Sequence, residues 1–192
     1  MNCFSTLIPI YLITFFSTAA FSAIAPIFPN KAASKGLSSS MAGIVFSIFG
    51  ISNMITSAPT GKLLPKFGAE MIYIFGLVLI GLSNIAFGFL IYVNDYSIFL
   101  IACFATRMFE GIAVGLLGPF SFFIVVRQTN VIGNLEVMTS TGFTLGFLFG
   151  GFIYSIFGFT VPFVILGSLL LLNVPFCVLS IDKLLVYDSY TE

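Results

Sequence analysis

The sequence contains no histidine, no tryptophan and few charged side chains. Without histidine it cannot build a Ser-His-Asp triad, a His-ligated zinc site or a haem site with a proximal histidine, and we expect no metal or other cofactor. Charged residues make up 7% of the chain, against about 25% in soluble domains. Seven basic and seven acidic groups cancel to a net charge of zero. This balance lacks the basic footprint of a nucleic-acid-binding protein.

What the chain has in abundance is apolar residues, which form 59% of its 192 positions and give a mean hydropathy of +1.15. One membrane-spanning helix needs about 20 predominantly apolar residues, so six spans use about 120 residues and leave the rest for connections. The apolar runs are continuous, whereas the strands of a membrane β-barrel alternate apolar and polar residues. The composition therefore predicts an all-α membrane protein with several spans.

The few charged residues divide the chain into six apolar segments. The last uncharged run, 137–181, is too long for one span and contains Gly158 and Pro162, so we expect two helices joined by a turn near 157–161. Pro119 is a candidate kink in the long fourth span. The predicted spans are 7–28, 41–60, 71–92, 98–126, 137–156 and 161–180.

Lysine and arginine set the expected orientation. With a cytoplasmic N-terminus, four basic residues fall inside and two outside, which favours cytoplasmic positions for both termini. Residues 1–192 then form one six-helix domain, with a short cytoplasmic tail at 184–192. The inside residues are Lys62, Lys66, Arg127 and Lys183, and the outside ones are Lys31 and Lys35.

A faint internal repeat links the two halves of the chain. The segment Gly61–Gly68, read as the turn after the second span, has the pattern Gly-x6-Gly with phenylalanine before the second glycine, and Gly151–Gly158 repeats it ninety residues later. A three-helix unit repeated with opposite topology produces such an echo, and inverted repeats of this kind are common in secondary transporters. We expect repeats at about 1–94 and 95–183.

Arg107 and Glu110 are charged residues inside the fourth span, and their spacing of three places them on one helical face. An ionised side chain near the bilayer centre costs about 2.5–3.5 kcal/mol on insertion scales. Two interpretations are open: a self-satisfied ion pair that orients the helix, or a charge on a substrate or proton pathway, which we favour. Of the two residues, Glu110 is the better candidate for a proton carrier.

Hydroxyl and amide side chains lie along the first, second and fifth spans, whereas the third and sixth spans have comparatively few polar residues. Such hydroxyls can bond their own helix or a neighbouring one, and they can also line a cavity. We expect the bare spans to face lipid and the polar ones to line a cavity. Thr18 in the first span and Asn53 in the second are candidates for that cavity.

The fifth span carries an acidic residue at its start and a glycine row along its length. Glu136 opens the span, where a carboxylate is favoured by the helix dipole; it is also a gating candidate that could pair with Lys66. Glycines four residues apart make a smooth face that lets a second helix approach closely. The row consists of Gly142, Gly146, Gly150 and Gly151, and Gly111 and Gly115 repeat the pattern in the fourth span.

Three of these patterns follow one another as motifs: Gly61-x-Leu63-x-Pro65-Lys66-x-Gly68, then Arg107-x-x-Glu110-Gly111, then Gly142-x3-Gly146-Phe147-x-x-Gly150-Gly151. In order and spacing they resemble the motifs of the N-terminal half of the major facilitator superfamily, in its drug:proton antiporter group. The end of the first span resembles the vesicular amine transporters of solute carrier family 18, and the sixth span is similar to the polyamine branch. The residues concerned are Ala25–Pro29, Val161–Phe163, Leu166, Gly167, Val174 and Pro175.

Several positions depart from the family pattern. Pro65 stands where the loop motif has aspartate, and Glu70 near where it has a basic residue, so the cytoplasmic charge lock is altered. Phe147 replaces the proline of the antiporter motif. Ser17 occupies the position of the first-span aspartate of monoamine carriers. Glu110 can supply an alternative carboxylate, which favours a polyamine or another organic cation as substrate over a monoamine.

The resemblance implies half of a twelve-helix fold that exchanges protons for a small organic cation by rocking two halves around a midplane site. Its partners would be the lipid bilayer, the cation, protons, and either a C-terminal six-helix half or a second copy of the chain. The alternative is a truncated, non-transporting membrane subunit or regulator; an intramembrane enzyme is weakly supported. On the family pattern, Ser17, Thr18, Asn53, Arg107 and Glu110 lie on the pathway, and the loop and glycine motifs with Glu136 form the gate.

Overall fold

The computed structural model describes residues 3–129 and 132–189 of the chain. Within them there are six α-helices, one short 3₁₀ helix and no strands. All six α-helices are long and apolar enough to cross a membrane, which confirms the all-α membrane bundle. Their bounds are α1 Cys3–Ser34, α2 Ser39–Phe67, α3 Ala69–Phe89, α4 Tyr96–Thr129, α5 Gly133–Phe157 and α6 Thr160–Ser189, and the 3₁₀ helix η1 is Leu90–Tyr92.

Three glycines interrupt the helical path. Gly36, Gly68 and Gly158 have φ near +82°, a left-handed conformation that L side chains rarely adopt. Gly68 and Gly158 directly follow the last residues of α2 and α5, so the last glycine of each Gly-x6-Gly segment has a positive φ and ends a helix. The expectation of a turn over the whole of Gly61–Gly68 was wrong, because Gly61 is helical and the turn consists of Gly68 alone.

The helices extend further than the apolar runs from which they were predicted. α2 continues to Phe67 rather than 60, and α6 to Ser189 rather than 180, so much of the segment 184–192 is helical. The helices can continue past the apolar runs because a helix satisfies its own backbone hydrogen bonds whether its side chains are apolar or polar. Polar side chains such as Lys62 therefore mark the edge of the apolar segment and not the end of the helix.

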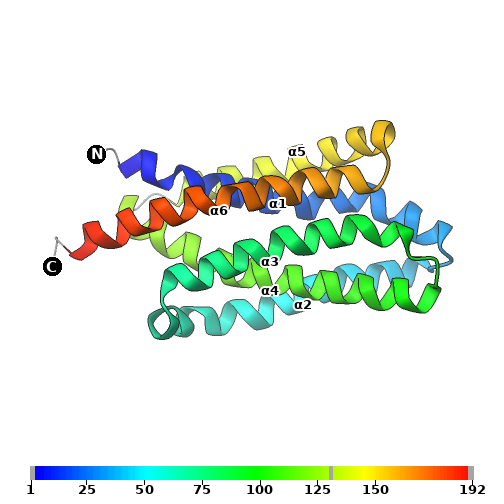
Figure 1. Cartoon of the computed structure of the whole chain (residues 1–192), viewed down its shortest axis with the longest axis horizontal. Coiled ribbons are helices and arrows are strands. Elements are labelled where there is room, and N and C mark those ends of the chain that lie inside the picture. The colour runs from blue at the N-terminus through cyan, green and yellow to red at the C-terminus, as the bar shows by residue number, and fades with distance from the viewer. Residues whose placement is uncertain (1–2, 130–131, 190–192) are drawn as a thin grey trace.

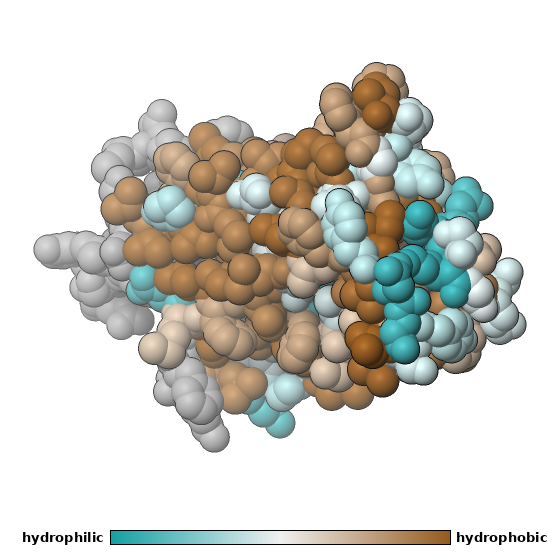
Figure 2. All heavy atoms as spheres, turned by 45° about the vertical axis from the view of Figure 1, so that its right-hand side comes forward, coloured by the Kyte–Doolittle hydropathy of each residue, from teal (hydrophilic) through white to brown (hydrophobic). Residues whose placement is uncertain are grey.

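The chain runs back and forth along one axis, and the start of α1 and the end of α6 lie at the same end of the bundle as the α2–α3 connection, the end of α4 and the start of α5 (Figure 1). At the opposite end, Lys35 Nζ donates to the Val93 carbonyl at 2.7 Å and joins the α1–α2 connection to the α3–α4 connection. Apolar side chains cover most of the face shown in Figure 2, and hydrophilic ones gather toward this opposite end. This distribution fits a bundle that crosses a bilayer along its long axis.

The helices pair in a symmetric pattern. α1 packs against α5, α2 against α4, and α3 against α6. If α1, α2 and α3 exchange places with α4, α5 and α6, the α1–α5 pair becomes the α4–α2 pair. The α3–α6 pair is unchanged by the same exchange. At that central pair, a Cβ on Gly81 would lie 3.1 Å from the Gly167 carbonyl oxygen, and one on Gly167 would lie 2.8 Å from that of Gly81. This packing is the one expected of two inverted three-helix repeats.

α4 remains helical through Pro119, the expected kink site. Proline has no N–H, so the carbonyl of Gly115, four residues earlier, loses its helical partner. The Thr60 hydroxyl of α2 donates to that carbonyl at 3.1 Å and also to the Thr56 carbonyl at 2.7 Å. One hydroxyl of the second span thus supplies a hydrogen bond that the proline removes from the fourth.

Candidate functional site

The Arg107–Glu110 pair lies inside the bundle. The Nη1 atom of Arg107 contacts the Oε2 atom of Glu110, and the two side chains are 1% and 0% exposed. Arg107 is the twelfth residue of α4, about 16 Å along the helix from Tyr96 at 1.5 Å per residue. The prediction that the two charges share a helical face is confirmed, and both point into the protein rather than toward lipid.

Helix α3 supplies one partner for each end of this ion pair. Asn84 Nδ2 donates to Glu110 Oε1 at 3.4 Å and to the carbonyl of Ile80 in its own helix at 3.1 Å. The guanidinium of Arg107 lies over the Phe87 ring, 4.1 Å from its centroid. We call these four residues, Asn84, Phe87, Arg107 and Glu110, the buried charge cluster.

The sequence had pointed to only the α4 side of the cluster. The third span was expected to face lipid, but Ser83, Asn84 and Phe87 are buried within the bundle, so that expectation was wrong for this face of α3. The available signal was Asn84 itself, an amide within the uncharged stretch 71–94. An amide within a membrane helix is expensive unless another helix satisfies it.

The cluster leaves four buried polar atoms without a hydrogen bond. They are Nε and Nη2 of Arg107 and Oδ1 of Asn84, and Oε2 of Glu110 is a fourth whose partner is the ion-pair contact with Arg107. Buried polar atoms are nearly always paired in folded proteins, so each exception calls for an explanation. A site that changes its occupancy gives one: donors and acceptors that are idle in one state have partners in another.

The predicted hydroxyls of α1 are bonded within their own helix. Ser17 Oγ and Thr18 Oγ1 both donate to the Thr14 carbonyl, at 3.1 and 2.7 Å, and both side chains are half-buried. Asn53 is half-buried on α2, and its backbone lies where a Cβ on Gly115 would meet it, 2.9 Å from its carbonyl oxygen. Among the described residues, none of these three bonds to the buried charge cluster.

The glycine row of α5 is a helix-packing surface, as its spacing predicted. A Cβ on Gly142 would lie 2.5 Å from the Phe15 carbonyl oxygen of α1, and one on Gly150 would lie 2.7 Å from the Ala23 Cβ. Gly146 is equally tight against α1, whereas a Cβ on Gly151 would meet nothing within 4 Å. Three of the four glycines therefore bring α1 and α5 together, and Gly151 has no such steric role.

The remaining predicted gate residues lie near the end of the bundle that carries the termini. Gly61 is exposed in α2, Gly68 forms the turn, and Glu136 is exposed in the first turn of α5. The side chain of Lys66 lies outside the described residues. A Lys66–Glu136 pair therefore remains a prediction.

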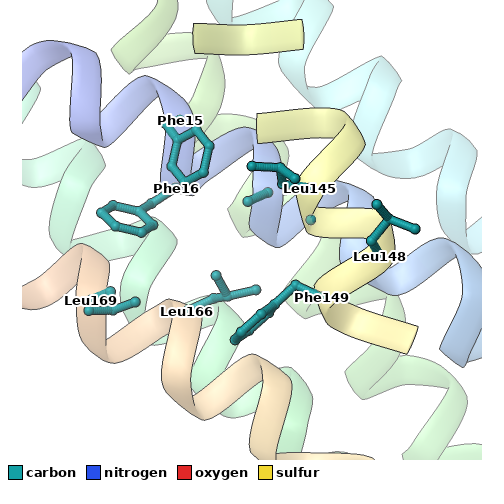
Figure 3. Close-up of a pocket in the computed structure, with 9 residues that line it drawn as sticks. Phe15, Phe16, Leu145, Leu148, Phe149, Leu166 and Leu169 are labelled. Carbon is teal, nitrogen blue, oxygen red and sulfur yellow. The ribbon is translucent and has the colours of Figure 1, made fainter. Parts of the chain in front are cut away.

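An apolar groove of about 350 Å³ opens between α1, α5 and α6, as Figure 3 shows. Its floor and walls carry no charged side chain and no polar one, so it offers no carboxylate to pair with a cation. The buried charge cluster, which holds a carboxylate, is therefore a stronger candidate site than this groove. The groove is lined by Phe15, Phe16, Ala19, Leu145, Gly146, Leu148, Phe149, Leu166 and Leu169.

The comparison with known families shows which protein family the chain belongs to. Residues 10–185 match the Major Facilitator Superfamily. The chain belongs to the major facilitator superfamily. Members of this superfamily are transporters rather than enzymes, which agrees with the six apolar helices and with the expected class of protein.

Several curated transporters are similar to the chain. The chain is 32% identical to the human MFS-type transporter SLC18B1 over 83% of its own length, and 33% identical to the mouse protein over 90%. It is 29% identical to Multidrug resistance protein 2 of Bacillus subtilis over 78% of its length. These alignments cover 36%, 37% and 37% of the three relatives. The chain thus spans a little over a third of the curated relatives it matches.

Proposed function

We propose that the chain forms the N-terminal six-helix half of a proton-coupled antiporter for a small organic cation such as an amine or a polyamine. The observation that carries this proposal is the burial of Glu110 opposite Arg107. Of the acidic side chains that the structure describes, Glu110 alone is buried; Asp95 and Glu136 are exposed and Glu70 is half-buried. Intramembrane ionisable residues that face the bundle interior mark ion and substrate pathways in transporters.

Charge arithmetic at the cluster links the proton to the cation. With Glu110 ionised, the pair with Arg107 is neutral, and a cation meets no net repulsion. When Glu110 takes a proton, only the positive guanidinium remains, and in a low-dielectric interior it repels a second cation strongly. Proton and substrate cation therefore exclude one another at the cluster, which is the property that an antiporter needs.

The names of the relatives support the transport part of the proposal, and the solute carrier family 18 resemblance supports the amine class. Ser17 in place of a carboxylate makes Glu110 the acidic group available to the substrate, which favours a polyamine or another organic cation over a monoamine. Thr18 and Asn53, with Ser17, would contribute to the pathway when the second half is present. Gly61, Lys66, Gly68 and Glu136 would form the cytoplasmic gate, with both termini in the cytoplasm.

A second bundle would complete the carrier. α2 and α5 are the least buried of the six spans, and both expose large apolar side chains, including Met54, Ile55, Leu148 and Phe152. We propose that these helices border a second six-helix half, supplied by a longer chain or by a second copy. The competing interpretation is a non-transporting membrane subunit or regulator.

Transport by a chimera tests the proposal. In it, this chain replaces the matched segment of the mouse SLC18B1 relative, and the product is reconstituted into liposomes with a pH gradient. We expect accumulation of a labelled polyamine driven by the gradient, and loss of that accumulation in Glu110→Gln. Asp95→Asn is the matched control: Asp95 Oδ1 accepts a hydrogen bond from the Ile98 N–H at the start of α4 at 3.0 Å, and asparagine caps a helix as well as aspartate does while also removing one negative charge. Gradient-driven accumulation that persists in Glu110→Gln would refute the assignment.

A further inference from the structure

Asn84 holds the carboxyl group of Glu110 from a different helix. The amide is 0% exposed, its Nδ2 lies 3.4 Å from Glu110 Oε1, and its Oδ1 has no hydrogen-bond partner. We propose that Asn84 is a positioning residue that binds the Glu110 carboxyl in both of its protonation states. This inference rests on the proposed function, in which Glu110 gains and loses a proton.

The chemistry of the two groups fits this role. An ionised carboxylate only accepts hydrogen bonds, and a protonated one adds an O–H that donates. An asparagine amide offers both kinds of partner, an NH₂ donor and a carbonyl acceptor. In the structure the donor is in use and the acceptor is idle. The idle Oδ1 atom of Asn84 is the acceptor that a protonated Glu110 requires.

The change of partner needs only a local movement. When a proton adds to the Glu110 carboxylate, the hydrogen bond from Nδ2 to Oε1 is replaced by one from the new O–H to the Oδ1 atom of the same amide, and the O–H of the carboxyl group is the one covalent bond that forms. The Nδ2 atom keeps its bond to the Ile80 carbonyl, 3.1 Å away, which anchors the amide in α3. Arg107 loses its anionic partner, but its guanidinium still lies on the Phe87 ring, an attraction that does not depend on Glu110.

Few charged groups other than Arg107 lie near the Glu110 carboxyl, where the proton is gained and lost. Arg107, on the same helix, faces Glu110 directly. Where α2 packs on the neighbouring Gly111, it presents Ser52 and the backbone of Asn53, which are uncharged. The charged side chains described on the helices packed against α4 lie toward the helix ends; they are Lys31 of α1, Lys62 of α2 and Glu70 of α3. Asn84 is therefore the group from another helix that meets the proton.

Infrared difference spectroscopy of the reconstituted chain during a pH titration tests this. The wild-type chain should show a protonated-carboxyl carbonyl band that Glu110→Gln lacks, which assigns the band to Glu110. In Asn84→Leu the band should shift toward the frequency of a carboxyl without a hydrogen bond. In Asn84→Ser it should shift in the same way, because serine can still bond the Ile80 carbonyl four residues back but is too short to reach Glu110. If Asn84→Leu does not fold, Asn84→Ser alone tests whether Asn84 binds the Glu110 carboxyl.

The matched control is Asn173→Leu in α6. Asn173 is also buried and also donates to the carbonyl four residues earlier, that of Leu169 at 2.7 Å, but it has no bond to Glu110. Its replacement should leave the band unchanged. A Glu110 band at the same frequency in both Asn84 variants, or an equal shift in Asn173→Leu, overturns the role of Asn84. A wild-type titration without any Glu110 band overturns the proton-exchange proposal itself, and with it this inference.

Discussion

Replacing Gly146 with alanine should push α1 and α5 apart. A Cβ at this position would lie closer than 3.0 Å to the backbone of Ala19 and to the Ser22 hydroxyl. Real Cβ atoms essentially never make contacts this short, and the backbone of Ala19 cannot turn aside as a flexible side chain could. The helices must therefore separate, or the local packing must be rebuilt.

The expected size of the effect follows from two opposing terms. Forcing an extra methyl into a packed interface costs about 1–3 kcal/mol, while replacing a helical glycine with alanine gains about 1 kcal/mol of helix propensity. Gly151→Ala gains the same propensity term, but its Cβ meets nothing within 4 Å. The difference between the two variants cancels the propensity term and isolates the contact with α1, which we expect to be about 1–3 kcal/mol.

Unfolding in mixed micelles with a rising fraction of denaturing detergent, followed by circular dichroism, measures this difference. Gly146→Ala should unfold at a lower detergent fraction than the wild type, and Gly151→Ala at the same or a higher one. If the two variants unfold together, the close α1–α5 contact is not part of the folded bundle and the pairing described above is wrong.

Three further predictions concern the cluster, the proline in α4 and the topology. Glu110→Leu should cost about 3–5 kcal/mol of stability, because it leaves Arg107 buried without its partner; combining it with Arg107→Leu should recover much of that loss in the same unfolding assay, and equal losses would argue against the ion pair. Thr60→Val should cost about 1–3 kcal/mol by removing the donor to the carbonyl that the proline frees, and an unchanged unfolding midpoint would contradict this bond. In a background without native cysteines, Lys35→Cys and Lys62→Cys should react with an impermeant thiol reagent from opposite sides of the membrane; labelling of both from one side would exclude the topology.

The six spans could be predicted because they depend on local composition. Uncharged apolar runs long enough to cross a bilayer leave a helix as the only open way to satisfy the backbone, and Gly158 correctly marked the division of the last run. The helix ends were less accessible to sequence reasoning. Residues such as Lys62 lie beyond the apolar segment, but the backbone hydrogen bonds of the helix continue there. The helix is therefore longer than the apolar segment from which it was predicted.

The part of the site that could be predicted is the part that lies on a single helix. Arg107 and Glu110 lie on one face because they are three residues apart, which the sequence shows directly. Asn84 and Phe87 join them through the packing of α3 on α4, which the spacing of residues within α4 does not show. The hydrogen bond from the Ser17 hydroxyl to the Thr14 carbonyl lies within one helix, so the spacing of three residues allows it, but the sequence does not show that it forms.

Proton release on substrate binding tests the central claim most directly. The chimeric carrier, in weakly buffered detergent solution with a pH indicator, is mixed with a polyamine at a pH where Glu110 is partly protonated. If Glu110 exchanges its proton for the cation, the wild-type carrier and Asp95→Asn release protons on binding, and Glu110→Gln binds with a smaller release or none. Equal proton release from the wild type and Glu110→Gln would contradict the account, because the exchanged proton would then come from another group.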